Sequence, residues 1–198
     1  MPIEIPFSPA DAERVIEDFI KTYVEISGAS GVVIGLSGGV DSAVVAVLCQ
    51  RSLGKERVKC LFLPDRTTPK IDAKHKDMLV EKFDLDCREI EITDLVKSIS
   101  ERSPEKPDKI ALANVKARLR MLFLYEYANA TKSIVCGTSN KSELLIGYFT
   151  KYGGWRNRHL TDWRSLQNSS LSTGEAYWYT QGNHQKAAIC WLVERADR

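Results

Sequence analysis

Short apolar runs alternate along the chain with longer segments in which apolar residues recur every three or four positions. The short runs have the length and composition of buried strands, and they occupy residues 31–36, 58–64, 87–93 and 133–138. The longer segments predict helices, at residues 9–26, 40–54, 68–84, 94–102, 109–131 and 140–149. Strands that alternate with helices predict a parallel sheet with helices on both faces, an α/β doubly wound fold. In such folds the ligand binds beyond the carboxyl ends of the strands.

Composition narrows the class of protein and its surroundings. The chain has 198 residues, of which 43% are hydrophobic and 27% charged, as in an ordinary globular domain. Its net charge of +2 gives no sign of a nucleic-acid partner. We expect no membrane partner and a cytoplasmic location, because no apolar run is long enough to span a bilayer and the N-terminus lacks the pattern of a signal peptide. The five cysteines include no closely spaced pair, which favours reduced thiols over disulfides or zinc.

The segment from Gly35 to Ser42 joins the first predicted strand to a helix through three glycines. Glycine allows a positive φ and a close approach of the backbone to a ligand. The helix that follows offers free N–H groups and the positive end of its dipole, which together form an anion site suited to phosphate. Ser37 and Ser42 add hydroxyl groups. The alternative is a tight turn that needs glycine, with a serine that only caps the helix.

Asp41 gives this glycine loop a particular chemistry. No lysine precedes Ser42, so the loop differs from that of the common nucleoside triphosphatases, and it also lacks the G-x-G-x-x-G pattern of dinucleotide-binding folds. A carboxylate beside pyrophosphate is repulsive unless a cation lies between them, and Mg²⁺ suits such oxygen ligands. Alternatively, Asp41 only complements the dipole of the first helical turn.

The sequence "SGGVDS", from Ser37 to Ser42, resembles the pyrophosphate loop of the ATP pyrophosphatase superfamily, whose fold is adenine nucleotide alpha hydrolase-like. These enzymes cleave ATP to AMP and pyrophosphate while they activate a carbonyl or carboxyl oxygen. The stretches "NVKARLRMLFLYEYAN" and "CGTSNKSELLIGYFTKYG" resemble one branch, the ammonia-dependent NAD synthetases, and the resemblance covers about residues 8–153.

The resemblance implies roles for individual residues. It implies ATP contacts by Gly35, Leu36, Ser37, Gly38, Gly39, Val40, Asp41, Ser42 and Thr138. It implies that Asp41 and Glu143 bind Mg²⁺, and that Arg118 and Lys151 bind deamido-NAD. Read without the resemblance, Thr138 and Glu143 suit helix capping, and Arg118 and Lys151 suit solvated surface positions.

Other basic side chains near these positions have weaker claims to a role. Arg120 lies two residues from Arg118 and therefore faces elsewhere on the helix, so we expect it to be structural. A group of four could edge the ATP cleft, although a solvated helix face is the favoured interpretation. The group consists of Arg66, Lys70, Lys74 and His75.

The reaction that the resemblance implies is amidation of deamido-NAD to NAD, with ATP as co-substrate. Attack of the nicotinate carboxylate on the α-phosphate gives an acyl-adenylate and pyrophosphate, and ammonia then displaces AMP. We expect free ammonia to be the nitrogen source, since the chain is too short to include a glutamine amidohydrolase domain. The sequence singles out no general base.

The family resemblance also implies a homodimer. The alternatives are a nucleotide-binding chain without catalysis and another ATP pyrophosphatase, such as a tRNA-modifying enzyme.

The composition changes after residue 153, which divides the chain into a synthetase domain at 1–153 and an aberrant tail at 154–198. All four tryptophans lie in the tail. Residues 163–170, "WRSLQNSS", can be back-translated and read one nucleotide later as GDLYKTQ, a stretch that the synthetase family carries. Residues 186–197 shift in the same direction to KPPSAGLWRGQT, another family stretch. We therefore expect the tail to be a frameshifted, poorly packed or disordered translation. The alternative is a genuine divergent segment.

Overall fold

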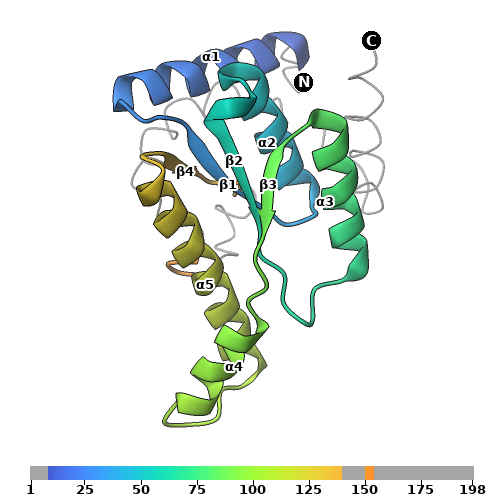
Figure 1. Cartoon of the computed structure of the whole chain (residues 1–198), viewed down its shortest axis with the longest axis vertical. Coiled ribbons are helices and arrows are strands. Elements are labelled where there is room, and N and C mark those ends of the chain that lie inside the picture. The colour runs from blue at the N-terminus through green and yellow to red at the C-terminus, as the bar shows by residue number, and fades with distance from the viewer. Residues whose placement is uncertain (1–8, 140–149, 154–198) are drawn as a thin grey trace, which may run out of the picture.

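A four-stranded parallel sheet forms the centre of the computed structural model, which describes residues 9–139 and 150–153 (Figure 1). The strand order is β3-β2-β1-β4. The strands are β1 (Val32–Leu36), β2 (Val58–Phe62), β3 (Asp86–Glu89) and β4 (Ile134–Cys136). Both neighbours of β1 pair with it in parallel, β2 on one side and β4 on the other. This arrangement confirms the predicted doubly wound architecture.

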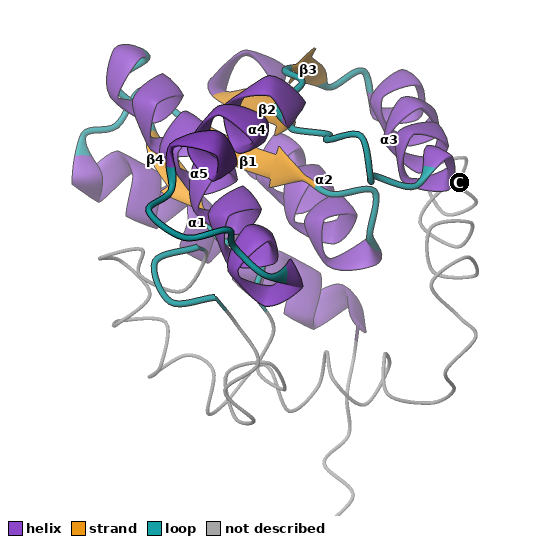
Figure 2. Cartoon of the chain, turned by 90° about the horizontal axis from the view of Figure 1, so that it is seen from below, coloured by secondary structure: helices purple, strands orange, loops and turns teal. Residues whose placement is uncertain are grey.

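Helices connect the strands and cover both faces of the sheet. They are α1 (Pro9–Ser27), α2 (Val40–Leu53), α3 (Lys70–Phe83), α4 (Thr93–Arg102) and α5 (Lys109–Ala130), with a short 3-10 helix η1 (Lys55–Arg57) before β2. Among the described residues, no helix is both long and apolar enough to cross a membrane. Figure 2, which views the molecule from below, shows the strands enclosed between the helices.

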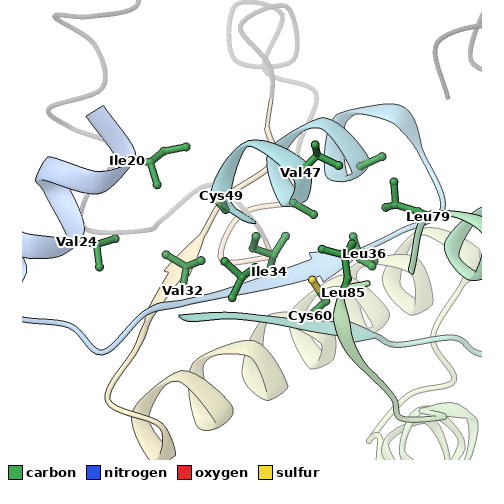
Figure 3. Close-up of a cluster of buried hydrophobic side chains, with 13 residues drawn as sticks. Ile20, Val24, Val32, Ile34, Leu36, Val47, Cys49, Cys60, Leu79 and Leu85 are labelled. Carbon is green, nitrogen blue, oxygen red and sulfur yellow. The ribbon is translucent and has the colours of Figure 1, made fainter. Parts of the chain in front are cut away.

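Alternate residues of β1 point into two separate hydrophobic clusters. Val32 and Ile34 pack in a cluster with buried side chains of α1, α2 and α3 (Figure 3). Val33 packs on the opposite face, in a cluster that includes Val96 of α4 and Leu124 of α5. This alternation follows from the two-residue period of a strand that is buried on both faces. It fixes α2 and α5 on opposite sides of β1.

The third strand is shorter than predicted. The apolar alternation of residues 87–93 predicted a strand throughout, but β3 ends at Glu89 and α4 begins at Thr93. The intervening chain still follows its neighbour, because the N–H of Ile90 donates to Phe62 O and the N–H of Ile92 donates to Pro64 O, both at 2.9 Å. Ile92 is fully buried at the start of α4. The apolar pattern therefore reports burial that continues beyond the regular strand.

Candidate active site

The glycine loop lies between the carboxyl end of β1 and the first turn of α2. Gly38 has a φ of +81°, a left-handed conformation that strains other residues. A Cβ atom there would also lie 2.6 Å from the Cα and backbone oxygen of Asp72 in α3. Gly39 precedes α2 in an extended conformation without a side-chain cap, so the positive end of the helix dipole lies at the loop, where it favours an anion.

Two hydroxyl groups brace this loop from within. Ser42 Oγ donates to Gly39 O at 2.9 Å and accepts from the N–H of Ser37 at 3.1 Å. Ser37 Oγ lies 3.1 Å from Ser42 Oγ and accepts from the N–H of Gly39 at 3.2 Å. Ser42 is 2% exposed, whereas Ser37 is exposed. In this conformation Ser42 shapes the loop from beneath, and Ser37 is the hydroxyl at its surface.

Other residues predicted to contact ATP lie around the same loop. Gly35 belongs to β1, and a Cβ atom there would approach Leu124 Cδ1 to 3.1 Å, so its lack of a side chain admits α5 against the sheet. Leu36 is buried and Val40 is half-buried. Thr138 follows β4, which pairs with β1 in parallel, so Thr138 lies at the same edge of the sheet as the loop.

Asp41 lies exposed in the first turn of α2. Its predicted partner in metal binding, Glu143, lies outside the described residues. Within residues 9–139 and 150–153, no group of three or more His, Cys, Asp or Glu side chains could hold a metal ion. An exposed carboxylate that directly follows the glycine loop is nevertheless a hard oxygen donor of the kind that suits Mg²⁺.

The two residues predicted to bind the substrate lie together. Arg118 is exposed on α5, and its Nε donates to Lys151 O at 3.1 Å. Lys151 is exposed, and its Nζ lies 5.3 Å from the ring centroid of Tyr152. Thr150 Oγ1 hydrogen-bonds Asn114 Oδ1 at 2.9 Å. Asn114, one turn before Arg118, therefore fixes the start of this turn, and its role had no distinctive signal in the sequence.

Arg120 is structural, as its position on the helix predicts. Its Nε donates to Leu63 O at 2.9 Å, and its Nη2 lies 2.9 Å from Asp65 Oδ2. Lys116 Nζ lies 3.0 Å from Asp65 Oδ1 and donates to Thr67 Oγ1 at 2.8 Å. Both cations therefore tie α5 to the segment that follows β2. The sequence predicted a structural role for Arg120 but pointed to no such role for Lys116.

Asp65 is the carboxylate at the centre of this ion-pair cluster, and its side chain is 5% exposed. Burial raises the pKa of Asp65, but hydrogen bonds from the side chain and backbone of Thr67 and the proximity of Lys116 outweigh it and lower the pKa to about 2. The carboxylate is thus ionised at neutral pH. The role of Asp65 could not be predicted from the sequence, because its partners Lys116 and Arg120 lie 51 and 55 residues further along the chain.

The four basic side chains suggested for the cleft edge divide into two groups. Arg66, Lys70 and Lys74 are exposed, as expected of a solvated face. For His75 the favoured interpretation was wrong. His75 is half-buried, and its Nδ1 lies 3.3 Å from Gly38 O, so it faces the glycine loop. The helical period placed His75 on a helix, but it did not predict which side of α3 meets the loop.

Comparison with known proteins decides between the superfamily branches. A family model described as NAD synthase matches residues 13–160. The chain belongs to the NAD synthase family. The match takes in the glycine loop, the whole of α5 and the turn at residues 150–153, so every residue of the candidate site lies within it.

Proteins similar to this NAD synthase family member are found in archaea. An NH3-dependent NAD+ synthetase from Archaeoglobus fulgidus is 49% identical over 145 residues, which are 71% of this chain and 58% of the relative. An NH3-dependent NAD+ synthetase from Methanocaldococcus jannaschii is 45% identical over 141 residues, which are 70% of this chain and 54% of the relative. The chain therefore spans little more than half the length of these relatives.

Solved structures that are similar to this chain have the same fold. An NMN synthetase from Francisella tularensis superposes with a TM-score of 0.71 and 32% identity, over 75% of this chain and 61% of that one. An NH3-dependent NAD synthetase from Campylobacter jejuni, in complex with nitrate, superposes with a TM-score of 0.69 and 30% identity, over 94% of this chain and 92% of that one. These matches agree with the adenine nucleotide alpha hydrolase-like fold predicted from the sequence.

Proposed function

We propose that this chain catalyses the ATP-dependent amidation of deamido-NAD to NAD with ammonia as the nitrogen donor. The glycine loop is the observation that carries the proposal. A left-handed Gly38, an uncapped α2 N-terminus and an adjacent Asp41 form an anion site that includes a carboxylate. That combination suits a magnesium pyrophosphate. Membership in the NAD synthase family and the names of the archaeal relatives support the choice of reaction.

In this proposal the chain works by positioning and charge neutralisation. Backbone N–H groups of the glycine loop bind the β- and γ-phosphates that leave as pyrophosphate, and Thr138 contacts ATP from the end of β4. Asp41 and Glu143 would hold Mg²⁺, which would offset negative charge on the phosphates. Arg118 and Lys151 bind deamido-NAD, for which a guanidinium offers a fork of donors. We assign no general base.

Steady-state NAD formation tests this proposal. The purified full chain is incubated with deamido-NAD, ATP, Mg²⁺ and ammonium, and NAD, AMP and pyrophosphate are measured in the same samples. We expect the three products in equal amounts. Nicotinate mononucleotide replaces deamido-NAD in a parallel reaction, because one structural relative is an NMN synthetase. Amidation of the mononucleotide alone would contradict the assigned substrate.

A second candidate is a nucleotide-binding chain without catalysis. It is favoured by one observation, that the chain spans only 58% of the Archaeoglobus relative. Calorimetric titration with ATP and Mg²⁺ separates the two candidates, because ATP binding without any NAD formation supports the second. A third candidate, a tRNA-modifying ATP pyrophosphatase, has no matching relative among those described above.

We further propose that the protein is a cytoplasmic homodimer. Its co-substrate ATP is supplied inside the cell, and α5 presents apolar side chains that a second copy can cover. Leu122 is 63% exposed, and Tyr125, on the same helical face, is also exposed. Light scattering coupled to size-exclusion chromatography should give twice the chain mass, and Leu122→Glu should give a monomer. A monomeric wild type would contradict this part of the proposal.

We also propose that residues 154–198 are a frameshifted translation. The two shifted reading frames described above support this origin. The encoding DNA decides the matter, because the codons of residues 163–170 must allow GDLYKTQ in the next frame. Codons that forbid this reading refute the frameshift. If the frameshift is correct, restoration of the reading frame should increase NAD formation.

A further inference from the structure

The first two turns of α3 lie directly against the glycine loop. Backbone and Cβ atoms of Asp72 occupy the space that a Cβ atom on Gly38 would need, at 2.6 Å. One turn later, His75 Nδ1 lies 3.3 Å from Gly38 O. A carbonyl oxygen can only accept, so the imidazole donates through Nδ1–H. The loop therefore has one hydrogen bond from outside itself at its central glycine.

This hydrogen bond fixes the orientation of the peptide group between Gly38 and Gly39. In a trans peptide the C=O and the N–H point to opposite sides. With Gly38 O held toward α3 by His75, the N–H of Gly39 points away from α3, toward Ser37 Oγ, to which it donates at 3.2 Å. Ser37 is the exposed hydroxyl of the loop. The N–H thus faces the side on which an anion would bind.

A peptide between two glycines needs such a restraint. Neither residue has a side chain to oppose rotation, and glycine populates both signs of φ with similar ease. If the group turned over, it would present a carbonyl oxygen to the anion in place of an N–H donor. Ser42 restrains the next carbonyl, that of Gly39, from inside the loop. Among residues 9–139 and 150–153, the side chain that restrains Gly38 O is that of His75.

We propose that His75 is a positioning residue for pyrophosphate binding, which holds the Gly38–Gly39 peptide with its N–H toward the phosphates. The inference rests on the proposed function for its ligand, and on the observed hydrogen bonds for its geometry. Both the neutral Nδ1–H tautomer and the imidazolium donate this bond. The role therefore requires a donor at this place and no particular charge on His75.

The test compares His75→Ala with His75→Asn in the full chain. The Asn side chain carries an N–H donor near the position of Nδ1, so it should preserve the restraint that Ala removes. Binding of ATP and of inorganic pyrophosphate, each with Mg²⁺, is measured by calorimetry. We expect about fivefold weaker binding of both in His75→Ala, the factor that corresponds to one hydrogen bond, and less than twofold in His75→Asn. Met78→Ala, an exposed position one turn further along α3, should bind both ligands as the wild type does.

A ligand-free measurement separates this inference from the proposed function. In chains labelled with ¹⁵N-glycine, the exchange of the Gly39 amide with solvent should be faster in His75→Ala than in His75→Asn and the wild type. Equal exchange in all three, or equal ATP affinity of the Ala and Asn variants beside a wild type that binds ATP, overturns the role of His75 alone. A wild type that binds neither ATP nor pyrophosphate overturns the proposed function and this inference together.

Discussion

Arg120 Nη2 lies 2.9 Å from Asp65 Oδ2, so α5 is joined to the segment after β2 by an ion pair whose carboxylate is buried. Lys116 binds the other carboxylate oxygen from the preceding turn of α5. The helix that carries Arg118 and the chain that leads to α3 are therefore held by one side chain. Loss of the Asp65 side chain should therefore lower the stability of the domain more than it weakens any single binding contact.

Asp65→Asn should lower the free energy of unfolding by about 2 kcal/mol, because it leaves Lys116 and Arg120 beside a neutral amide. Both cations are partly exposed, which keeps the loss below that for a fully buried pair. Urea denaturation monitored by circular dichroism measures the change. Glu101→Gln is the matched control, since its pair with Lys97 is solvent-exposed, and it should shift stability by less than about 0.5 kcal/mol. Equal effects of the two substitutions would contradict the special role of Asp65.

The same carboxylate makes stability depend on acid. The pKa of Asp65 is about 2 in the folded chain, below the value of about 3.9 for an unfolded chain. The resulting stabilisation is complete above about pH 5 and is lost as the pH falls through about 2. Between pH 5 and pH 2 the wild type should lose about 2 kcal/mol more stability than Asp65→Asn. Parallel pH curves for the two proteins would show that the pKa of Asp65 is not lowered.

Gly38→Ala tests the packing of α3 against the loop. Gly54 also has a φ of +81°, but a Cβ atom there would have no neighbour within 4 Å, whereas at Gly38 it would meet Asp72 at 2.6 Å. Gly54→Ala should therefore cost only backbone strain, about 1 kcal/mol. Gly38→Ala should cost more and should also abolish ATP binding. Thermal denaturation and calorimetry measure the two effects, and ATP binding by a folded Gly38→Ala protein would argue against the loop as the phosphate site.

Asn114→Ala tests the support of the turn that carries Lys151. The substitution removes the hydrogen bond to Thr150 Oγ1, so the turn should lose its position relative to Arg118. We expect KM for deamido-NAD to rise about fivefold, with KM for ATP unchanged. Asn129→Ala, an exposed asparagine near the end of the same helix, is the control. A rise in KM for ATP alone would contradict the prediction that Asn114 supports binding of deamido-NAD.

The sheet and the loop were predictable because both depend on local sequence. Buried strands appear as apolar runs, and Gly38 marks a turn whose positive φ strains residues other than glycine. The cluster around Asp65 was not predictable, since its cations come from a helix far along the chain. The side of α3 that faces the loop was also hidden, because the pattern around His75 does not distinguish contact with a loop from contact with solvent. The predicted role of Glu143 stays a prediction.

The central claim is that the turn after β1 binds the two phosphates that ATP loses. A crystal structure of the full chain grown with ATP and Mg²⁺ tests it most directly. The account predicts density for the β- and γ-phosphates against the backbone from Ser37 to Ser42, with Mg²⁺ beside Asp41. Nucleotide bound at another place, with this turn empty, would contradict it.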